Sequence, residues 1–270
     1  MKYKMIVADF DDTLLNSQRT YSQRIKNIIK KYVDKGGKFV IATGRMTAAV
    51  LPYCRDLGLK GEVITYQGGV IADIESGEIL EQTHISYLDA YKLALHIEEM
   101  GYYYHVYCGD TFIVKNATPQ SVRYANLCNV DYVELNYDIS KFIFDNKICP
   151  VKMMIITEED NVMPLIKKLS AKYSDTFLFN TSKKWMVEMV PVLVNKGFAV
   201  AQLAKKYGIK REEIICIGDS LNDLSMIEYA GLGAVVANGS AEAKAAADII
   251  APSNDDEGVA YIIEKYGFLE

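Results

Sequence analysis

A short apolar run that ends in a cluster of carboxylates is the feature that most constrains this chain. Met5-Ile6-Val7-Ala8 is short enough to be a buried strand, and Asp9, Asp11 and Asp12 come after it within four positions. Carboxylates this close repel one another, so a cation or solvating water is needed to stabilise their charges. Two interpretations are open. The segment is either a site for a hard cation such as Mg²⁺, which takes oxygen ligands, or a solvated acidic turn after an edge strand.

The composition is that of a soluble globular protein with room for one large domain or two modest ones. The chain has 270 residues, of which 50% are hydrophobic and 24% charged. Its formal net charge of −5 provides no basic surface for nucleic acid. A substrate that carries phosphate would therefore need local positive charge from a metal ion or a lysine.

The location expected from the sequence is the cytoplasm. No apolar run approaches the roughly 20 residues of a membrane helix, and the N-terminus does not resemble a secretory leader. The cysteine count is odd and no CxxC pair occurs, which predicts free thiols rather than disulfides or a zinc site. These cysteines are Cys54, Cys108, Cys128, Cys149 and Cys216.

The first 83 residues alternate between strand and helix patterns. Apolar residues recur at helical spacing from Ile25 to Val33, after Ser22 and before Gly36-Gly37. Strands are expected at residues 38–42 and 62–66, with a helix between them at 47–57. This order is typical of right-handed parallel crossovers. A hairpin is expected at residues 70–82.

The pattern changes from residue 84 to residue 188 and then returns. The middle segment suggests antiparallel strands with helices on one side, and strand–helix alternation resumes from Pro191. The expected fold class is therefore α/β: a Rossmann-like parallel-sheet core, with helices on both faces, plus an inserted α+β cap domain. Residues 1–83 and 189–270 would form the discontinuous core, and residues 84–188 the insert.

Polar groups stand at the ends of four of the expected strands. They are Asp9/Asp11/Asp12, Thr43-Gly44-Arg45, Gln67-Gly68-Gly69 and Asp219/Asn222/Asp223. The carboxyl ends of parallel strands share one edge of a sheet, so these groups are expected to converge, and Lys196 at the start of a helix can join them. Taken singly, each has a simpler interpretation: Thr43 as a helix cap, Lys196 as a solvated charge, residues 218–223 as a capped turn.

The combination suits phosphoryl transfer. Asp9 can attack phosphorus and form an aspartyl-phosphate, and Asp11 can protonate the leaving group and later activate water. Mg²⁺ held by Asp9, Asp219 and Asp223 would offset the negative charge. The expected donors to the phosphate oxygens are Thr43, Gly44, Lys196 and Asn222.

Four motifs carry a resemblance to a known family. Asp9-Phe10-Asp11-Asp12-Thr13-Leu14, Ala42-Thr43-Gly44-Arg45, Asn195-Lys196-Gly197 and Gly218-Asp219-Ser220-Leu221-Asn222-Asp223 resemble those of the haloacid dehalogenase (HAD) superfamily. Their order, and the large insert, are similar to the Cof-like hydrolases of the sugar-phosphatase type. The resemblance implies a Mg²⁺-dependent phosphatase of small phosphorylated metabolites.

The resemblance also implies individual roles. Asp9 would be the nucleophile and Asp11 the acid/base, with Mg²⁺ on Asp9, Asp219 and the backbone carbonyl of Asp11. Asp223 would be a further ligand or a support. The insert would be the cap, in which His105, Tyr107, Ser182 and Trp185 are candidate contacts.

Two positions depart from the Cof-like pattern. Asp12 stands where glycine is usual. Aspartate tolerates the backbone angles of a tight turn, but it places a further carboxylate near the phosphate site. Gln67-Gly68-Gly69 stands where Asn-Gly-Ala is common, so Gln67, with Arg45, is a candidate substrate contact.

Two other functions use similar residues. A phosphomutase would pass the same aspartyl-phosphate to a sugar. A phosphate-accepting signalling protein would hold it without hydrolysis, but such receivers are short domains without a cap. Neither the substrate nor the oligomeric state can be inferred from the residues alone.

Overall fold

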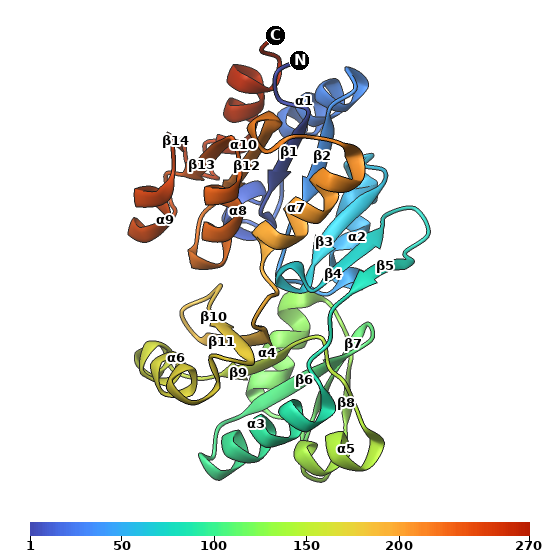
Figure 1. Ribbon diagram of the computed structural model, residues 1–270, viewed down its shortest axis with the longest axis vertical. Coiled ribbons are helices and arrows are strands. Elements are labelled where there is room, and N and C mark those ends of the chain that lie inside the picture. Colours follow the sequence, from blue (N-terminus) through green and yellow to red (C-terminus); the bar gives the residue numbers. More distant parts are fainter. The chain divides into compact units, whose positions relative to one another are not determined.

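Strand β1 (Met5–Ala8) lies between β2 and β12 in a five-stranded parallel sheet. The computed structural model describes residues 1–270 (Figure 1), and the strand order in this sheet is β14-β13-β12-β1-β2. The other strands are β2 (Lys38–Ile41), β12 (Ile214–Gly218), β13 (Leu232–Val236) and β14 (Ile249–Ala251). The first strand of the chain thus pairs directly with one that lies about two hundred residues further along, Met5 opposite Ile214.

Helices cover both faces of this sheet, because successive strand residues point to opposite sides. Met5 and Val7 pack with apolar residues of α7 and α8, whereas Ile6 faces the side of α1 and the C-terminal turn near Gly267. The helices of the sheet are α1 (Gln23–Asp34), α2 (Thr47–Asp56), α7 (Lys196–Tyr207), α8 (Leu224–Tyr229), α9 (Ala241–Ala246) and α10 (Gly258–Ile262). Short turns lie at η1 (Phe10–Leu14), η3 (Arg211–Glu213), η4 (Leu221–Asp223) and η5 (Ile263–Gly267). This confirms the predicted α/β class.

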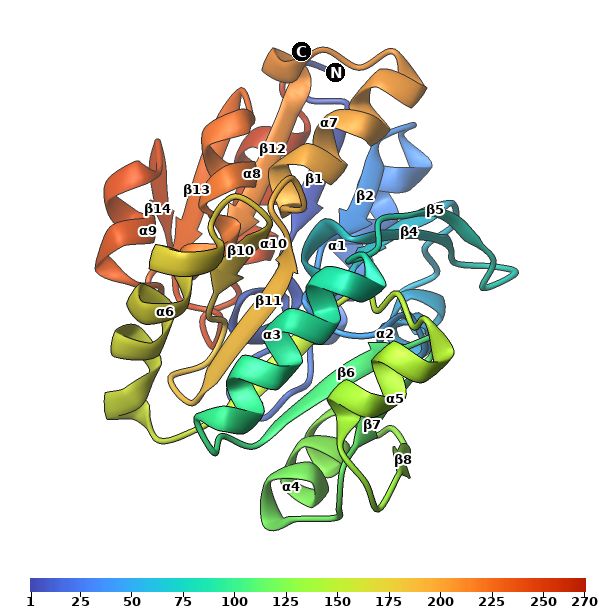
Figure 2. The ribbon, with the colours of Figure 1, turned by 60° about the horizontal axis from the view of Figure 1, so that its bottom comes forward.

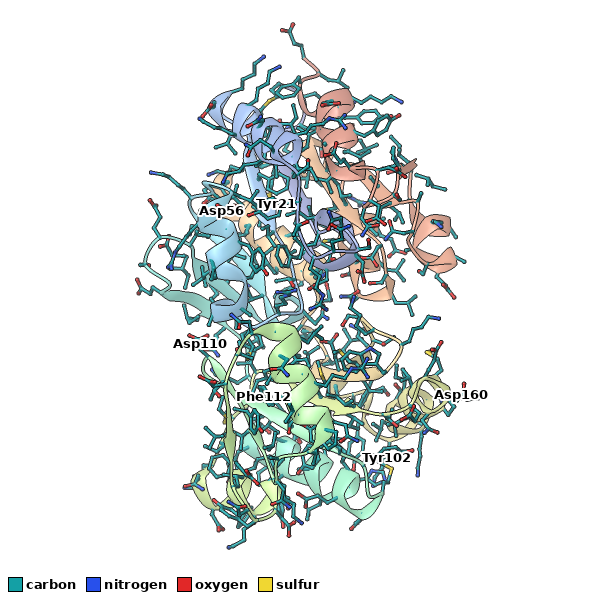
Figure 3. All side chains as sticks on the ribbon, turned by 180° about the vertical axis from the view of Figure 1, so that it is seen from behind. Tyr21, Asp56, Tyr102, Asp110, Phe112 and Asp160 are labelled. Atoms are coloured by element: carbon teal, nitrogen blue, oxygen red, sulfur yellow. The ribbon has the colours of Figure 1, made fainter.

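The start of α1 agrees with its sequence signals. Ser22 caps the helix by accepting a hydrogen bond from the backbone N–H of Ile25 at 3.2 Å. Ahead of this cap, the Tyr21 hydroxyl donates to Asp56 Oδ2 at 2.6 Å, and the two labelled side chains are neighbours in Figure 3. The segment between η1 and α1 is thereby tied to the last residue of α2.

The third strand differs from expectation. β3 (Glu62–Thr65) is joined to β2 by an isolated parallel bridge, Ala42 with Ile64, and otherwise pairs antiparallel with β4 (Val70–Asp73). With β5 (Ile79–Gln82) it forms a separate three-stranded sheet, β3-β4-β5. The strand pattern alone shows where a strand lies and not which neighbour it pairs with. The expected hairpin at residues 70–82 is present.

Residues 81–194 form most of a second unit with its own sheet, in the order β10-β11-β9-β6-β7-β8. Its strands are β6 (Tyr104–Cys108), β7 (Thr111–Val114), β8 (Tyr132–Glu134), β9 (Met153–Ile156), β10 (Phe177–Asn180) and β11 (Met186–Pro191). Its helices are α3 (Tyr87–Glu99), α4 (Pro119–Cys128), α5 (Ile139–Asn146) and α6 (Glu159–Tyr173), and Figure 2 shows α3 and α5 lying over strands of this sheet.

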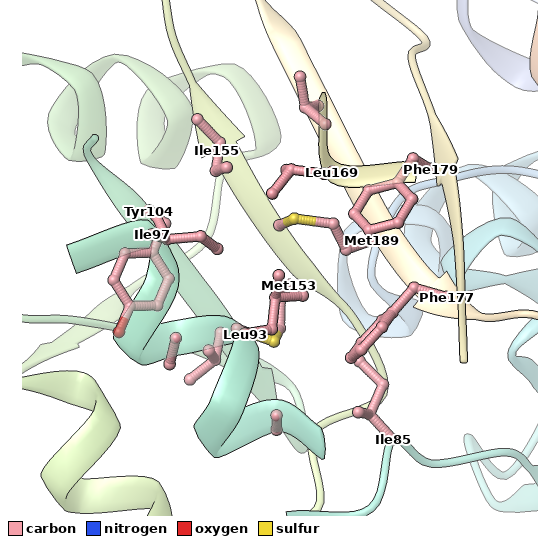
Figure 4. Close-up of a cluster of buried hydrophobic side chains, with 14 of the residues drawn as sticks. Ile85, Leu93, Ile97, Tyr104, Met153, Ile155, Leu169, Phe177, Phe179 and Met189 are labelled. Carbon is pink, nitrogen blue, oxygen red and sulfur yellow. The ribbon is translucent and has the colours of Figure 1, made fainter. Parts of the chain in front are cut away.

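The core of this unit is an apolar layer between the sheet and α3, α5 and α6. Leu93 and Ile97 of α3 pack with Met153, Ile155 and other inward-facing strand residues, as Figure 4 shows. The neighbouring strand residue Met154 points to the opposite face, where its sulfur lies 3.7 Å from the Tyr107 hydroxyl. The unit has its own hydrophobic core, as an independent domain requires.

The two units are interleaved along the chain. The first comprises Met1–Gly44, Leu51–Leu80 and Asn195–Glu270, and the second Arg45–Val50 and Glu81–Val194. The short segment at the start of α2 thus groups with the second unit, which the sequence pattern does not indicate. None of the helices has the length and apolar content needed to cross a bilayer.

Candidate active site

Asp9 and Asp219 each stand at the end of a strand of the parallel sheet, and these strands are neighbours. Asp9 comes directly after β1 and its N–H donates to Ile217 O at 2.8 Å, whereas Asp219 comes directly after β12. Because the two strands are parallel and in register, both carboxylates leave the sheet at the same edge. Residues 210 positions apart therefore meet through backbone pairing alone.

Lys196 lies between two carboxylates. It is the first residue of α7, where the side chain of Asn195 caps the helix by accepting from Phe198 N–H at 2.8 Å. Its ammonium is completely buried and donates to Asp223 Oδ1 at 2.6 Å and to Asp9 Oδ1. A buried ammonium is stable only with such partners.

Asp223 organises the turn after β12. Its Oδ2 accepts from the backbone N–H groups of Asp219 at 2.9 Å and Ser220 at 3.1 Å, while its Oδ1 accepts from Lys196. Gly218 leaves the space for this carboxylate, because a Cβ there would lie 2.6 Å from Asp223 Oδ2. The turn and the position of the lysine are thus fixed by one side chain.

Three carboxylates converge on this edge. One oxygen from each of Asp9, Asp219 and Asp223 lies within 4.8 Å of the others. Burial raises the pKa of Asp9 well above its usual value; Lys196 opposes this effect, and Asp223 and Asp219 add to it. Burial, and then the charge of Asp223, raise the pKa of Asp219 to about 7. The cluster thus holds more negative charge than a single lysine neutralises.

The charge of Lys196 is stabilised by its partners. Burial lowers the pKa of this ammonium, but the charges of Asp223 and Asp9 outweigh the burial, so its pKa is raised above the usual value. Lys196 is therefore a permanent cation at neutral pH. It provides one positive charge at the point where β1 and α7 meet.

Asp11 and Asp12 lie in η1, the turn immediately after Asp9. Asp11 is half-buried with an extended backbone, and Asp12 has a left-handed backbone with φ of 63°. Thr13, which sequence reasoning did not single out, donates its hydroxyl to Asp219 Oδ1 at 2.9 Å. Its place in the first of the four motifs, Asp9-Phe10-Asp11-Asp12-Thr13-Leu14, was the signal that could have identified it.

Thr43 is also at this edge of the sheet. It lies just beyond β2, is 1% exposed, and its N–H donates to Ile64 O at 2.9 Å. Its carbonyl accepts from Gln67 N–H at 3.1 Å, so it connects the ends of β2 and β3. Gly44 comes next in a bend, and Arg45 is buried within the segment that groups with the second unit.

Gln67 and Asn222 are in direct contact. Asn222 Nδ2 donates to Gln67 Oε1 at 3.0 Å, and both side chains are buried. Tyr66, Gln67 and Gly68 have consecutive positive φ angles of 53°, 62° and 97° in the turn η2 (Tyr66–Gly68). This turn packs on the start of α7, since a Cβ at Gly68 would lie 2.3 Å from Asn195 O. Strained turns of this kind concentrate at functional sites.

Two of the four candidate substrate contacts in the second unit are buried in its interior. His105 and Tyr107 are fully buried, with His105 Nε2 3.0 Å from the Tyr107 hydroxyl, which in turn donates to the Tyr124 hydroxyl at 2.6 Å. Ser182 and Trp185 are half-buried, and Arg123 stacks over the Trp185 ring. The first pair therefore packs the interior of this unit.

The model of one protein family, described as haloacid dehalogenase-like hydrolase, matches residues 6–263. The matched range includes Lys196 and all three carboxylates of the cluster, those of Asp9, Asp219 and Asp223. The chain belongs to the haloacid dehalogenase-like hydrolases. The sequence-based prediction of this family is confirmed.

Individual relatives match this hydrolase over nearly its whole length. A Streptococcus pyogenes serotype M6 protein with a provisional phosphatase name is 31% identical, over 98% of this chain and 99% of its own. The Bacillus subtilis 5-amino-6-(5-phospho-D-ribitylamino)uracil phosphatase YwtE is 27% identical, over 97% of each. A haloacid dehalogenase-like hydrolase from Bacteroides thetaiotaomicron has a crystal structure that matches with a TM-score of 0.84 and 29% identity, covering 97% of this chain and 99% of that one. The predicted enzyme class, a HAD-type phosphatase, is confirmed at the level of the family.

Proposed function

We propose that this protein hydrolyses small phosphomonoesters with Mg²⁺ through an aspartyl-phosphate on Asp9. The observation that carries the proposal is the convergence of Asp9, Asp219 and Asp223 oxygens within 4.8 Å, beside the buried ammonium of Lys196. Nucleophile, metal ligands and a fixed positive charge are the parts that phosphoryl transfer requires at one point. The family match supports the reaction class.

The carboxylates fit a hard divalent cation. Their oxygens are the ligand type that Mg²⁺ prefers. Burial, with the charges of neighbouring carboxylates, raises the pKa values of Asp9 and Asp219, and a bound cation would favour the ionised form of both. We assign Asp9, Asp219 and the backbone carbonyl of Asp11 as ligands. Both oxygens of Asp223 already accept hydrogen bonds, which favours a supporting role for it over direct ligation. When bound, Mg²⁺ supplies the charge that lets a carboxylate approach a phosphate.

The chemical steps fall to two aspartates. Asp9 forms a bond to phosphorus as the bond from phosphorus to the leaving oxygen breaks, and Asp11 gives its proton to that oxygen. Asp11 then takes a proton from water, whose oxygen attacks the phosphorus and releases Asp9 as a carboxylate. Lys196 favours the ionised form of Asp9 and orients its carboxylate, since its ammonium already donates to Asp9 Oδ1.

The phosphate oxygens would be bound by Thr43, Gly44, Lys196 and Asn222. Thr43 and Asn222 belong to turns that Gln67 connects, through its N–H in one case and its side-chain oxygen in the other. We further assign Gln67 and Arg45 to contacts with the rest of the substrate. Such donors are effective when the fold holds them in place before the substrate arrives.

The proposed substrates are sugar phosphates and similar small metabolites, and residues 84–188 are proposed as the inserted cap domain. The Bacillus subtilis relative acts, by its name, on a phosphorylated ribityl compound, which supports this class. All five cysteines are free thiols, the state that a reducing compartment maintains, which supports a cytoplasmic location.

The test uses the purified chain and p-nitrophenyl phosphate. We expect turnover with Mg²⁺, loss of turnover with EDTA, and recovery when Mg²⁺ is restored. Asp9→Asn should abolish turnover and leave the circular dichroism spectrum unchanged. Asp11→Asn should accumulate a phosphorylated enzyme that hydrolyses slowly. Turnover that persists in EDTA would reject the metal assignment, and a phosphorylated wild type that releases no phosphate would indicate a phosphate-accepting protein instead.

A further inference from the structure

Two asparagines far along the chain hold the turn that carries Asp11 and Asp12. Asn238 Nδ2 donates to the backbone carbonyl of Asp12 at 2.7 Å, and Asn254 Nδ2 donates to the carbonyl of Leu15 at 3.0 Å. Both bonds end on backbone oxygens, so they fix the path of the chain rather than one side chain. One acts in the middle of the turn η1, at residue 12, and the other at residue 15, just after it.

A hydrogen bond also joins the two asparagines to each other. Asn254 N–H donates to Asn238 Oδ1 at 2.9 Å, so the amide of Asn238 uses both its ends, one on residue 12 and one on residue 254. Asn254 is 6% exposed, which leaves its side chain little freedom. The pair forms a continuous bridge, which we name the asparagine clamp (Asn238 and Asn254).

The turn needs such support because of Asp12. Its φ of 63° is left-handed, a region that a residue with a Cβ occupies at a cost of about 1 kcal/mol or more, although aspartate tolerates it better than most. Glycine would adopt this conformation without that cost. The hydrogen bond from Asn238 to the Asp12 carbonyl therefore stabilises a backbone conformation that is costly for the residue that adopts it.

The segment that carries Asn238 also contacts the second carboxylate-bearing turn. Ser240 N–H donates to Asp219 O at 2.8 Å, and a Cβ at Gly239 would lie 2.8 Å from the same oxygen. Residues 238–240 thus bind the turn after β1 on one side and the turn after β12 on the other. A displacement of this segment would move Asp11 relative to Asp219.

We propose that Asn238 and Asn254 are positioning residues, which hold the turn at residues 11–15 so that Asp11 stays aligned with Asp9 through the reaction. This rests on the proposed function, because it takes Asp11 to be the acid/base and Asp9 the nucleophile. Neither asparagine carries a charge or a reactive group, so both act only through the backbone of the turn. Misalignment of a catalytic group lowers the rate of the chemical step more than it weakens substrate binding.

The test is a double-mutant cycle between positions 238 and 12. Asn238→Ala should lower kcat for p-nitrophenyl phosphate about tenfold while KM changes less than about twofold. In an Asp12→Gly background the same substitution should cost less than about threefold, since the left-handed conformation then carries no Cβ strain for the bond from Asn238 to offset. Asn161→Ala removes an exposed asparagine of α6 and is the matched control, with no expected change.

Hydrogen exchange measured without substrate separates the clamp from the reaction. Amides of residues 11–15 should exchange faster in Asn238→Ala, and in Asn254→Ala as a second variant, while amides of β1 and β12 keep their protection. Unchanged exchange at residues 11–15 overturns the proposal whatever the activity. The proposal is also overturned if Asn238→Ala lowers kcat equally in the wild type and in Asp12→Gly, or if the loss of kcat equals the fraction of unfolded protein. Absence of turnover in the wild type would reject the proposed function and leave the exchange result to decide on the clamp.

Discussion

Lys196 is the residue on which the electrostatics of the site depend. Its ammonium is 0% exposed and bonded to two carboxylates that also face Asp219. An ion pair of this kind contributes little net stability when formed but leaves uncompensated buried charge when one partner is removed. Because two carboxylates share this one ammonium, losing one carboxylate leaves the lysine with a partner, whereas losing the lysine leaves both carboxylates without their cation. The metal-free protein should therefore tolerate losing a carboxylate better than losing the lysine.

Replacing the lysine tests this directly. Lys196→Met should lower the free energy of unfolding by about 3–5 kcal/mol in EDTA, because Asp9 and Asp223 then repel each other without a cation between them. The measurement is urea unfolding, with Lys205→Met, an exposed lysine of the same helix, as the control. A loss below about 1 kcal/mol would mean that the carboxylates are already protonated or solvated.

The raised pKa of Asp219 determines how the stability of the metal-free protein should depend on pH. Its folded-state pKa of about 7 lies above the ordinary 3.8, so between these values the folded protein keeps a proton that the unfolded chain has released. The free energy of unfolding should then fall as pH rises from about 4 to about 7. Urea unfolding in EDTA at about pH 5 and about pH 8 measures this, and Asp219→Asn should reduce the difference. Equal pH dependence in both proteins would contradict the shift.

Two helices of the core approach closely enough that only glycine fits between them. A Cβ at Gly197 of α7 would lie 2.2 Å from Ser225 O of α8, and the Gly197 N–H donates to Ser225 Oγ at 3.0 Å. Gly197 is next to Lys196 in the sequence, so the packing of α7 on α8 determines where the ammonium of Lys196 lies. Element packing and site geometry are linked at this point.

Gly197→Ala should therefore affect both stability and activity. Overpacking at a rigid helix contact lowers stability by about 1–3 kcal/mol, and the accompanying shift of Lys196 should lower kcat. Gly208→Ala is the matched control: it meets nothing within 4 Å but has a left-handed φ of 64° at the end of the same helix. It should lose about 1 kcal/mol and keep its activity. If Gly197→Ala were less stable than Gly208→Ala but had the same kcat, the helix contact would not determine the position of Lys196, and the prediction would be wrong.

At the scale of the whole molecule, local patterns in the sequence predicted the fold class and the convergence of the strand-end residues, but not every contact. The alternation of strands and helices predicted the parallel core, and the motifs at strand ends predicted that Asp9, Lys196 and Asp219 would meet, as they do. The pairing of β3 with β4 was not predictable, because a strand's own residues do not specify its partner. The bond from Asn238 to the Asp12 carbonyl was not predictable either, since it joins a side chain to backbone 226 positions away.

The covalent intermediate is the claim on which the proposed function depends. The most direct measurement is mass spectrometry of the protein, acid-quenched during turnover of p-nitrophenyl phosphate with Mg²⁺, together with peptide mapping. We predict one phosphoryl group on the peptide that contains Asp9, enriched in Asp11→Asn and absent in Asp9→Asn. Turnover without any covalent phosphate, or phosphate located on a residue other than Asp9, would contradict it.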